Sequence, residues 1–235
     1  MRILGIIPAR AGSKGVPGKN IKLLDGKPLI WYTIQTAKRS NVFSEIILST
    51  EDQEIADIAL GMGISIPSLR PKELAYDSSK SIDVVLHCVK EQFNRGFIYD
   101  AVILLQPTSP FREENLIENT LRVFEERKAD SLVTVRKVPD HFNPHWVFES
   151  DEQKMLKIST GENEIISRRQ DLPEAFYRDG QLYITSTEVL LKNRTFFGQR
   201  LTYFVNEFEG AKINIDTMGD WHKAEEYILK NKIEF

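Results

Sequence analysis

Along the first 135 residues, short apolar runs alternate with stretches in which apolar residues recur every three or four positions. The short runs predict buried strands and the longer period predicts amphipathic helices. The expected strands are 3–7, 45–49, 101–105 and 131–135, and the expected helices are 29–39, 52–60, 82–93 and 114–125. Near-continuous Val, Ile and Leu indicate strands covered on both faces. The pattern therefore predicts an α/β fold with a mainly parallel, doubly wound, Rossmann-like sheet.

The alternation stops at about residue 137 and resumes with a strand-like run at 181–185. We expect residues 137–177 to form an insertion or arm, and residues 1–136 with 178–235 to form the core. Aromatic residues in the insertion, among them Phe142 and Trp146, favour burial over a disordered loop. At the end of the chain, the spacing of Trp221, Ala224, Ile228 and Ile233 predicts one amphipathic helix.

A basic loop with three glycines follows the first predicted strand. The first 39 residues hold eight Lys or Arg against one acid, Asp25. We expect Gly12, Gly15 and Gly18 to adopt positive φ and to turn backbone N–H groups into one concavity, which is a site for phosphates. The loop fits neither a Walker motif nor a dinucleotide fingerprint, because the glycines recur at an even spacing of three and no Ser or Thr follows Gly18-Lys19. A plain solvated basic loop is the competing interpretation.

Composition narrows the class of protein. The net charge is −3, and since the first 39 residues carry +7, the remaining 196 carry −10. This segregation argues against nucleic-acid binding and for one local anion site. The single cysteine, Cys88, excludes an internal disulfide and fits a reducing compartment. No apolar stretch approaches the length of a membrane span and no signal peptide is evident, so we expect a cytoplasmic protein without membrane or nucleic-acid partners.

Five ordered blocks carry a resemblance to a known family. They are residues 7–20, residues 69–75 with 77–81, the segment Leu105-Gln-Pro-Thr-Ser-Pro-Phe-Arg112, residues 168–173 before Asp179-Gly180, and residues 213–217. Together they resemble the acylneuraminate cytidylyltransferases, which activate sialic acid and related nine-carbon keto-sugar acids with CTP. The resemblance spans nearly the whole chain. It implies a nucleotidyltransferase fold whose insertion pairs with a second subunit, giving a homodimer.

The resemblance also implies roles for individual residues. Arg10, Lys19 and Asn20 would bind the phosphates and ribose of the nucleotide, with Gly12, Ser13 and Lys14 beside them. Arg70, Ser79 and Ser81 would bind the cytosine. Gln106 and Thr108 would bind the sugar. Arg169, Arg178 and Asp179 would lie near its carboxylate or the phosphates. For Arg70 an exposed loop arginine, and for Thr108 a structural turn, are the competing interpretations.

Asp216 is the expected Mg²⁺ ligand, and Arg10, Lys19 and Asp216 are the expected catalytic residues. Here the chain departs from the Asp-x-Asp pattern of the family, because it has Asn214-Ile-Asp216. Asn214 offers a carbonyl oxygen but no charge, so we expect weaker metal binding or a metal that arrives with the nucleotide.

Two further departures concern the sugar. Trp146 stands where sialic-acid enzymes tend to have a lysine, and Asp179 stands where they have asparagine. An added acid near an anionic substrate is unfavourable, which favours a related nonulosonic acid of the legionaminic or pseudaminic type. The alternatives are a sugar-1-phosphate nucleotidyltransferase that uses another nucleotide, and a nucleotide-binding homologue without catalysis.

Overall fold

The computed structural model describes residues 1–231 of the 235-residue chain. Position 233 of the predicted final helix lies outside the described residues. The chain divides into two compact units, one of residues 1–134 with 179–235 and one of residues 135–178. The first unit holds most of the sheet, except for residues 135–137 and 176–178 of two strands, and it holds the three segments that converge at the candidate site described below.

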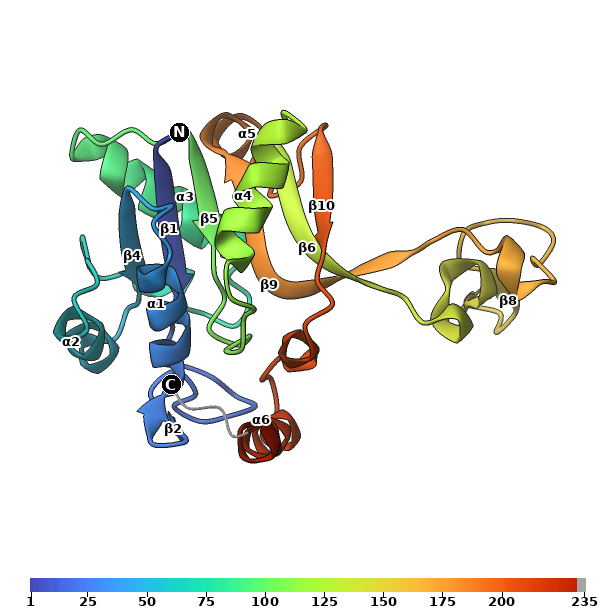
Figure 1. Cartoon of the computed structure of the whole chain (residues 1–235), viewed down its shortest axis with the longest axis horizontal. Coiled ribbons are helices and arrows are strands. Elements are labelled where there is room, and N and C mark those ends of the chain that lie inside the picture. Colours follow the sequence, from blue (N-terminus) through green and yellow to red (C-terminus); the bar gives the residue numbers. More distant parts are fainter. Residues whose placement is uncertain (232–235) are drawn as a thin grey trace. The chain divides into compact units, whose positions relative to one another are not determined.

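A six-stranded sheet in the order β10-β6-β9-β5-β1-β4 forms the centre of the first unit (Figure 1). Strand β1 (Ile3–Pro8) lies between β5 (Ala101–Leu104) and β4 (Glu45–Ser49) and runs parallel to both. Strand β9 (Phe176–Ser186) is antiparallel to β5. The two outer strands on that side are β6 (Ser131–Lys137) and β10 (Leu201–Val205). All four strands predicted in the first 135 residues are therefore confirmed.

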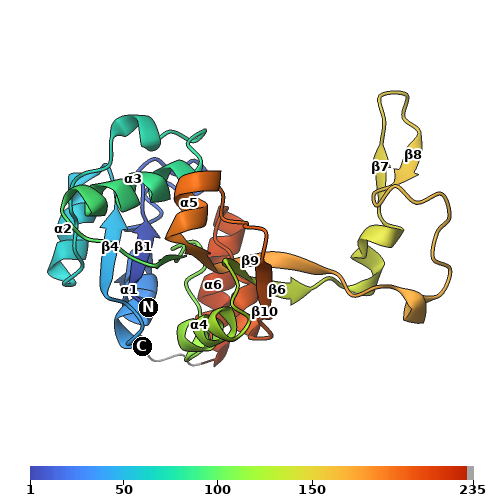
Figure 2. The ribbon, with the colours of Figure 1, turned by 90° about the horizontal axis from the view of Figure 1, so that it is seen from above.

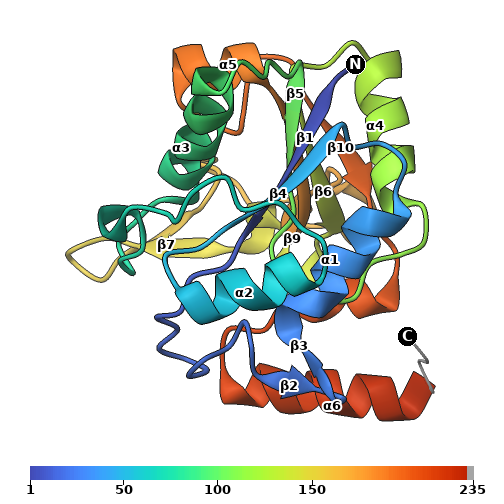
Figure 3. The same cartoon turned by 90° about the vertical axis from the view of Figure 1, so that its left-hand side faces the viewer.

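Helices cover both faces of this sheet, as Figures 2 and 3 show. On one face lie α3 (Ser81–Asn94) and α5 (Thr187–Asn193). On the other lie α1 (Leu29–Arg39), α2 (Gln53–Gly61) and α4 (Leu116–Glu126), whose buried residues form one core cluster with those of β1, β4, β5 and β9. Because apolar side chains are buried on both sides of the sheet, its strands read as continuous apolar runs in the sequence.

A second core cluster lies beyond the carboxyl ends of the parallel strands. Helix α6 (Met218–Asn231) buries Trp221, Ala224 and Ile228 against the start of α1 and the short hairpin of β2 (Leu23–Leu24) and β3 (Lys27–Pro28). Figure 3 shows α6 lying along this hairpin. The cluster also contains Val16 and Ile215, so it joins the glycine loop to the segment that precedes α6.

The second unit contains the hairpin of β7 (Phe148–Ser150) and β8 (Leu156–Ile158). Hydrogen bonds join the segment before this hairpin to the segment after it: Trp146 Nε1 donates to Ile166 O at 2.6 Å and Asn143 Nδ2 donates to Pro173 O at 2.9 Å. Several large apolar side chains are nevertheless exposed, among them Met155 and Leu156. This unit therefore presents an apolar surface to solvent.

Within residues 1–231, no helix combines the length and the apolar character that crossing a bilayer requires.

Candidate active site

The glycine loop, residues 9–20, follows β1 directly and is held in a fixed fold by its own residues. Asn20 is buried and its Nδ2 donates to Arg10 O at 2.7 Å, which ties the end of the loop to its beginning. The N–H of Ala11 donates to Glu51 Oε1 at 2.9 Å, and Val16 is fully buried. The loop is therefore anchored at three points, while the side chain of Lys14 extends into solvent.

The glycines of this loop have different roles, and the expectation of three positive φ angles is wrong for two of them. Only Gly18 has a positive φ, +61°. A Cβ at Gly15 would lie 2.0 Å from the carbonyl oxygen of Asp216, so the absence of a side chain at Gly15 permits a close approach of two backbones. A Cβ at Gly12 would meet no atom within 4 Å. Of the three glycines, Gly15 is therefore the one required by close packing, because its backbone lies against that of Asp216.

Lys19 joins the loop to that same segment. Its Nζ donates to Ile215 O at 2.7 Å and lies 3.3 Å from Asp216 Oδ1. The Lys19 side chain is 11% exposed, whereas that of Asp216 is 63% exposed. The loop after the first strand and the late aspartate, which are almost 200 residues apart in sequence, are thus in direct contact.

The loop after β5 meets the same point. Ile215 N donates to Thr108 O at 2.7 Å, and Ser109 Oγ lies 3.5 Å from Asn214 Oδ1. Gln106 belongs to this loop, and its Oε1 lies close to Gly180 on β9, where an added Cβ would be 3.6 Å from it. Three segments that sequence patterns singled out separately, the glycine loop, 106–109 and 214–216, therefore converge at one edge of the sheet.

The position of Asp216 is fixed by the start of α6. Thr217 Oγ1 and Asp220 form a reciprocal cap: Thr217 N donates to Asp220 Oδ2 at 3.1 Å and Asp220 N donates to Thr217 Oγ1 at 3.3 Å. Hydrogen bonds, first from the Thr217 side chain, lower the pKa of Asp220 to about 2. The carboxylate of Asp220 is therefore a structural anion at this helix start.

Arg112 was not among the predicted site residues, yet it holds the 106–109 loop in place. Its Nη2 donates to Gln106 O at 2.8 Å and to Gln181 O at 3.1 Å, and its Nη1 donates to Thr33 Oγ1 at 3.0 Å. Burial lowers the pKa of Arg112 to about 9, and the charge of Asp179 opposes the shift. Arg112 is the last residue of one of the five motif blocks, but the sequence does not show whether an arginine is buried or exposed.

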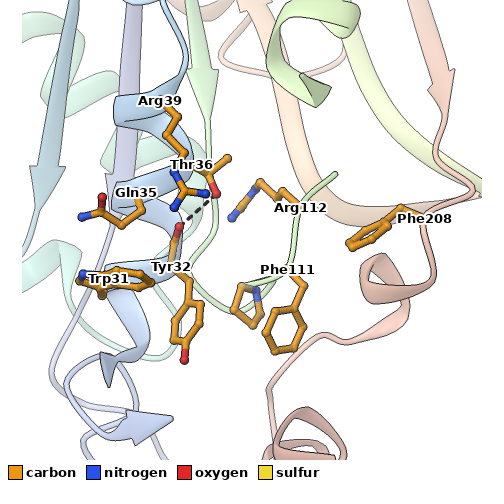
Figure 4. Close-up of a pocket in the computed structure, with 9 residues that line it drawn as sticks. Trp31, Tyr32, Gln35, Thr36, Arg39, Phe111, Arg112 and Phe208 are labelled. Carbon is orange, nitrogen blue, oxygen red and sulfur yellow. Dashed lines mark hydrogen bonds between the residues drawn. The ribbon is translucent and has the colours of Figure 1, made fainter. Parts of the chain in front are cut away.

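A cavity of about 110 Å³ lies behind this arginine (Figure 4). It is lined by α1, by Phe111 and Arg112, and by Phe208. Sites for ligands of drug size or larger occupy roughly 300 Å³ or more, so this cavity is too small for a nucleoside triphosphate. It lies on the α1 face of the loop and is separate from the convergence of the three segments.

The predicted base-reading residues occupy the region between β4 and α3. Arg70 is buried, its Nε donates to Ser49 Oγ at 3.0 Å, and its Nη2 donates to Ser49 O. Burial lowers the pKa of Arg70. Ser79 Oγ donates to Glu73 O at 3.0 Å, and Ser81 is the first residue of α3. Arg70 is therefore not the exposed loop arginine of the competing interpretation, and much of its hydrogen bonding already goes to β4.

Asp77 lies between these residues and the glycine loop. Its Oδ1 lies 2.6 Å from Arg10 Nη2 and its Oδ2 lies 2.7 Å from Lys14 Nζ. Hydrogen bonds from Lys14 and Arg10 lower the pKa of this carboxyl group. The positive charge predicted for the loop is thus partly balanced by an acid from a distant segment, which charge counting along the chain did not reveal.

Asp179, which was expected near the substrate, is enclosed by residues of the first unit. Its side chain is buried, its Oδ1 accepts from Thr134 Oγ1 at 2.5 Å and from Gln181 N at 2.9 Å, and its Oδ2 accepts from Asn206 Nδ2 at 2.8 Å. These donors, together with the charge of Arg112, stabilise the ionised carboxylate of Asp179 within the protein. Gln181, two residues further along β9, is fully buried, and neither atom of its side-chain amide has a hydrogen-bond partner within residues 1–231.

The two predicted arginines belong to the second unit. Arg169 Nε forms an ion pair with Asp140 of the same unit, and Arg178 is exposed. Cys88 is buried on α3, and burial raises the pKa of its thiol to about 11, which agrees with a structural rather than a reactive role.

The residues that could hold a divalent cation are few. Residues 1–231 contain no group of three or more His, Cys, Asp or Glu side chains placed to bind one ion. Asp216 is exposed, and its Oδ2 accepts from Asn214 Nδ2 at 2.6 Å. One carboxylate and one amide cannot complete the coordination of a metal ion by themselves. They suit Mg²⁺, which is commonly bound by one or two carboxylates together with phosphate oxygens of the substrate.

Comparison with known proteins identifies the family of this chain. A family model described as cytidylyltransferase matches residues 4–228. The chain is 34% identical to CMP-N,N'-diacetyllegionaminic acid synthase of Legionella pneumophila, over 99% of this chain and 98% of that protein. It is 32% identical to the pseudaminic acid cytidylyltransferase of Campylobacter jejuni, over 94% and 93% of the two chains.

A solved structure of CMP:2-keto-3-deoxy-manno-octonic acid synthetase in complex with CTP matches with a TM-score of 0.72, over 98% of this chain and 100% of that one, at 14% identity. This likeness shows the fold alone. The sequence matches confirm the family that the five motif blocks indicated and, with it, a nucleotidyltransferase. The chain belongs to the cytidylyltransferase family.

Proposed function

We propose that this protein transfers the cytidylyl group of CTP to a nonulosonic acid of the legionaminic type and releases pyrophosphate. The observation that carries the proposal is the contact of the basic glycine loop with the Asp216 segment through Gly15 and Lys19. Positive side chains and a carboxylate that could bind a cation meet at the edge where loops after parallel strands gather. A triphosphate requires both kinds of group.

The chain's own residues supply binding and orientation. Lys19 is held by Ile215 O, so its ammonium group is fixed without being fully neutralised. Arg10 and Lys14 extend from the same loop and would take further phosphate oxygens. Gln106 and Thr108 would orient the sugar, whose anomeric hydroxyl attacks the α-phosphorus in line with the leaving pyrophosphate. The fixed cations would stabilise the charge that develops on the departing group.

We also propose that the reaction uses Mg²⁺, with Asp216 and Asn214 as the protein ligands and the triphosphate as the other source of oxygen atoms. When bound, the ion would neutralise phosphate charge. The exposure of Asp216 supports this assignment, because its carboxylate is accessible to an ion that arrives with the triphosphate.

The relatives support the choice of sugar. A legionaminic acid synthase matches over almost its entire length, and a pseudaminic acid cytidylyltransferase matches nearly as far. The exposed apolar side chains of the second unit support a homodimer, because surfaces of this kind usually mark an interface. The free thiol of Cys88 fits the reducing cytoplasm, where we expect the protein to act.

Pyrophosphate release tests the proposal directly. The protein is incubated with Mg²⁺ and each of the four nucleoside triphosphates, against a panel of nonulosonic acids and sugar 1-phosphates. We expect release only with CTP and a nonulosonic acid, and most rapidly with N,N'-diacetyllegionaminic acid. Turnover with UTP or GTP and a sugar phosphate would instead support a sugar-1-phosphate nucleotidyltransferase, and CTP binding without release would support a homologue without catalysis.

A further inference from the structure

The acid Asp77 occupies the basic groups that the proposed function assigns to the triphosphate. Its two carboxylate oxygens lie 2.6 Å from Arg10 Nη2 and 2.7 Å from Lys14 Nζ. Arg10 Nη1 also lies 3.4 Å from Ala75 O, so the segment around Asp77 contacts the glycine loop at two points. A carboxylate that presents two oxygens to two cations makes the same charge-assisted contacts as two non-bridging oxygens of a phosphate.

These ion pairs are exchangeable. The side chains of Arg10, Lys14 and Asp77 are 32%, 88% and 39% exposed, so water screens their attraction. Exposed pairs of this kind contribute little to stability. A triphosphate carries several negative charges and can compete for the same cations, whereas a retained Asp77 carboxylate would repel it.

The segment that carries Asp77 can move without disturbing the core. On one side it is anchored by the buried Arg70, and on the other by α3. Between them, Ser79 N donates to Tyr76 O at 3.0 Å, which closes a turn around Asp77, and the Tyr76 side chain is 62% exposed. A change in this turn breaks surface ion pairs but exposes no buried apolar group.

We propose that Asp77 is a built-in competitor of the triphosphate: in the nucleotide-free protein its carboxylate occupies the phosphate position on Arg10 and Lys14, and CTP displaces it. This proposal rests on the proposed function. Its consequence is that Asp77 lowers the affinity for CTP and prevents the cationic loop from holding other anions. The lowered pKa of Asp77 keeps the carboxyl group ionised at neutral pH, so the competition operates under ordinary conditions.

Calorimetric titration with CTP, and separately with inorganic tripolyphosphate, tests the proposal in the wild type and in Asp77→Asn. The matched control is Asp83→Asn, because Asp83 Oδ1 lies 2.7 Å from Arg194 Nη2 and its side chain is 34% exposed, in an ion pair of similar geometry on α3. Thermal denaturation establishes that both variants are folded. We expect Asp77→Asn to bind both ligands roughly three- to tenfold more tightly than the wild type, and Asp83→Asn to bind them as the wild type does.

The outcomes separate this proposal from the proposed function. If a folded Asp77→Asn binds the two ligands as the wild type does, or more weakly, the competitor role is overturned. Weaker binding would show that Asp77 instead positions Arg10 and Lys14 for the ligand. A wild type that binds tripolyphosphate but shows no preference for CTP would contradict the proposed function. In that case the affinities of Asp77→Asn and the wild type for tripolyphosphate would still decide the role of Asp77. If neither the wild type nor Asp77→Asn binds either ligand, both proposals fail.

Discussion

At the scale of residues, sequence motifs identified side chains that meet at the candidate site, but they did not show which side chains are buried. Lys19, Asn20 and Asp216 were selected from motifs, and the structure places all three around the contact between the glycine loop and the segment before α6. Asp179 was selected in the same way, and its side chain is buried. A motif fixes the chemical type of a side chain, but burial depends on strands that are distant in sequence, so the enclosure of Asp179 could not be read from the chain.

The same limit applies to the charge of the glycine loop. Counting residues gave +7 for the first 39 positions, yet Asp77 neutralises part of that charge through Arg10 and Lys14. Asp77 was present in one of the motif blocks, but only the folded chain shows which cations it meets.

Replacing Asn214 with Asp tests the metal assignment. Asn214 now donates its amide to Asp216 at 2.6 Å, and Asn214→Asp would place a second carboxylate there. We expect the Mg²⁺ concentration for half-maximal pyrophosphate release to fall roughly tenfold, because two carboxylates attract the ion more strongly than one. Asn94→Asp makes the same change at an exposed asparagine at the end of α3, and a similar fall in this control would indicate a general effect of charge. An unchanged Mg²⁺ requirement in Asn214→Asp would contradict the role of Asp216 and Asn214 as ligands.

At the scale of elements, long periodic segments were predictable and short ones were not. The bounds of α1 and β4 agree with the sequence prediction at both ends. The hairpin of β2 and β3 has two residues in each strand, which is too short for any period to show. Strand β9 was anticipated over 181–185, but nothing in its composition indicated that it runs antiparallel to β5.

The cap at the start of α6 gives a prediction about stability. Asp220→Ala removes the acceptor for Thr217 N and Thr217 Oγ1, and we expect the free energy of unfolding to fall by about 1 kcal/mol at pH 7. Because the folded-state pKa, about 2, lies below the ordinary value of 3.8, the contribution of the charge is complete above pH 3.8 and is lost as the pH falls through 2.

Urea denaturation of both proteins at pH 7 and near pH 3 measures this difference. The gap between wild type and Asp220→Ala should narrow at the lower pH. A gap that stays constant or widens would show that the charge of Asp220 does not stabilise the start of the helix.

At the scale of the whole molecule, the second unit bears on the state of assembly. Leu156 on β8 is 66% exposed and Met155 is 62% exposed. If a second copy covers this surface, Leu156→Glu places a charge in an apolar interface and should shift the protein from dimer to monomer at micromolar concentration, as measured by sedimentation velocity. Leu229→Glu, on the 78% exposed Leu229 of α6, serves as the control and should leave the mass unchanged. A wild type that sediments as a monomer would refute the dimer.

The proposed function depends on the glycine loop holding the nucleotide against the Asp216 segment, and calorimetric titration of CTP into Lys19→Glu tests this most directly. Lys27→Glu makes the same change of charge on β3, where the side chain is exposed. We expect Lys19→Glu to lose CTP affinity by roughly 100-fold or more, because a fixed cation is replaced by an anion at the phosphates, and Lys27→Glu to bind CTP within about threefold of the wild type. Equal affinity for CTP in Lys19→Glu and the wild type would contradict the role of the glycine loop in holding the nucleotide.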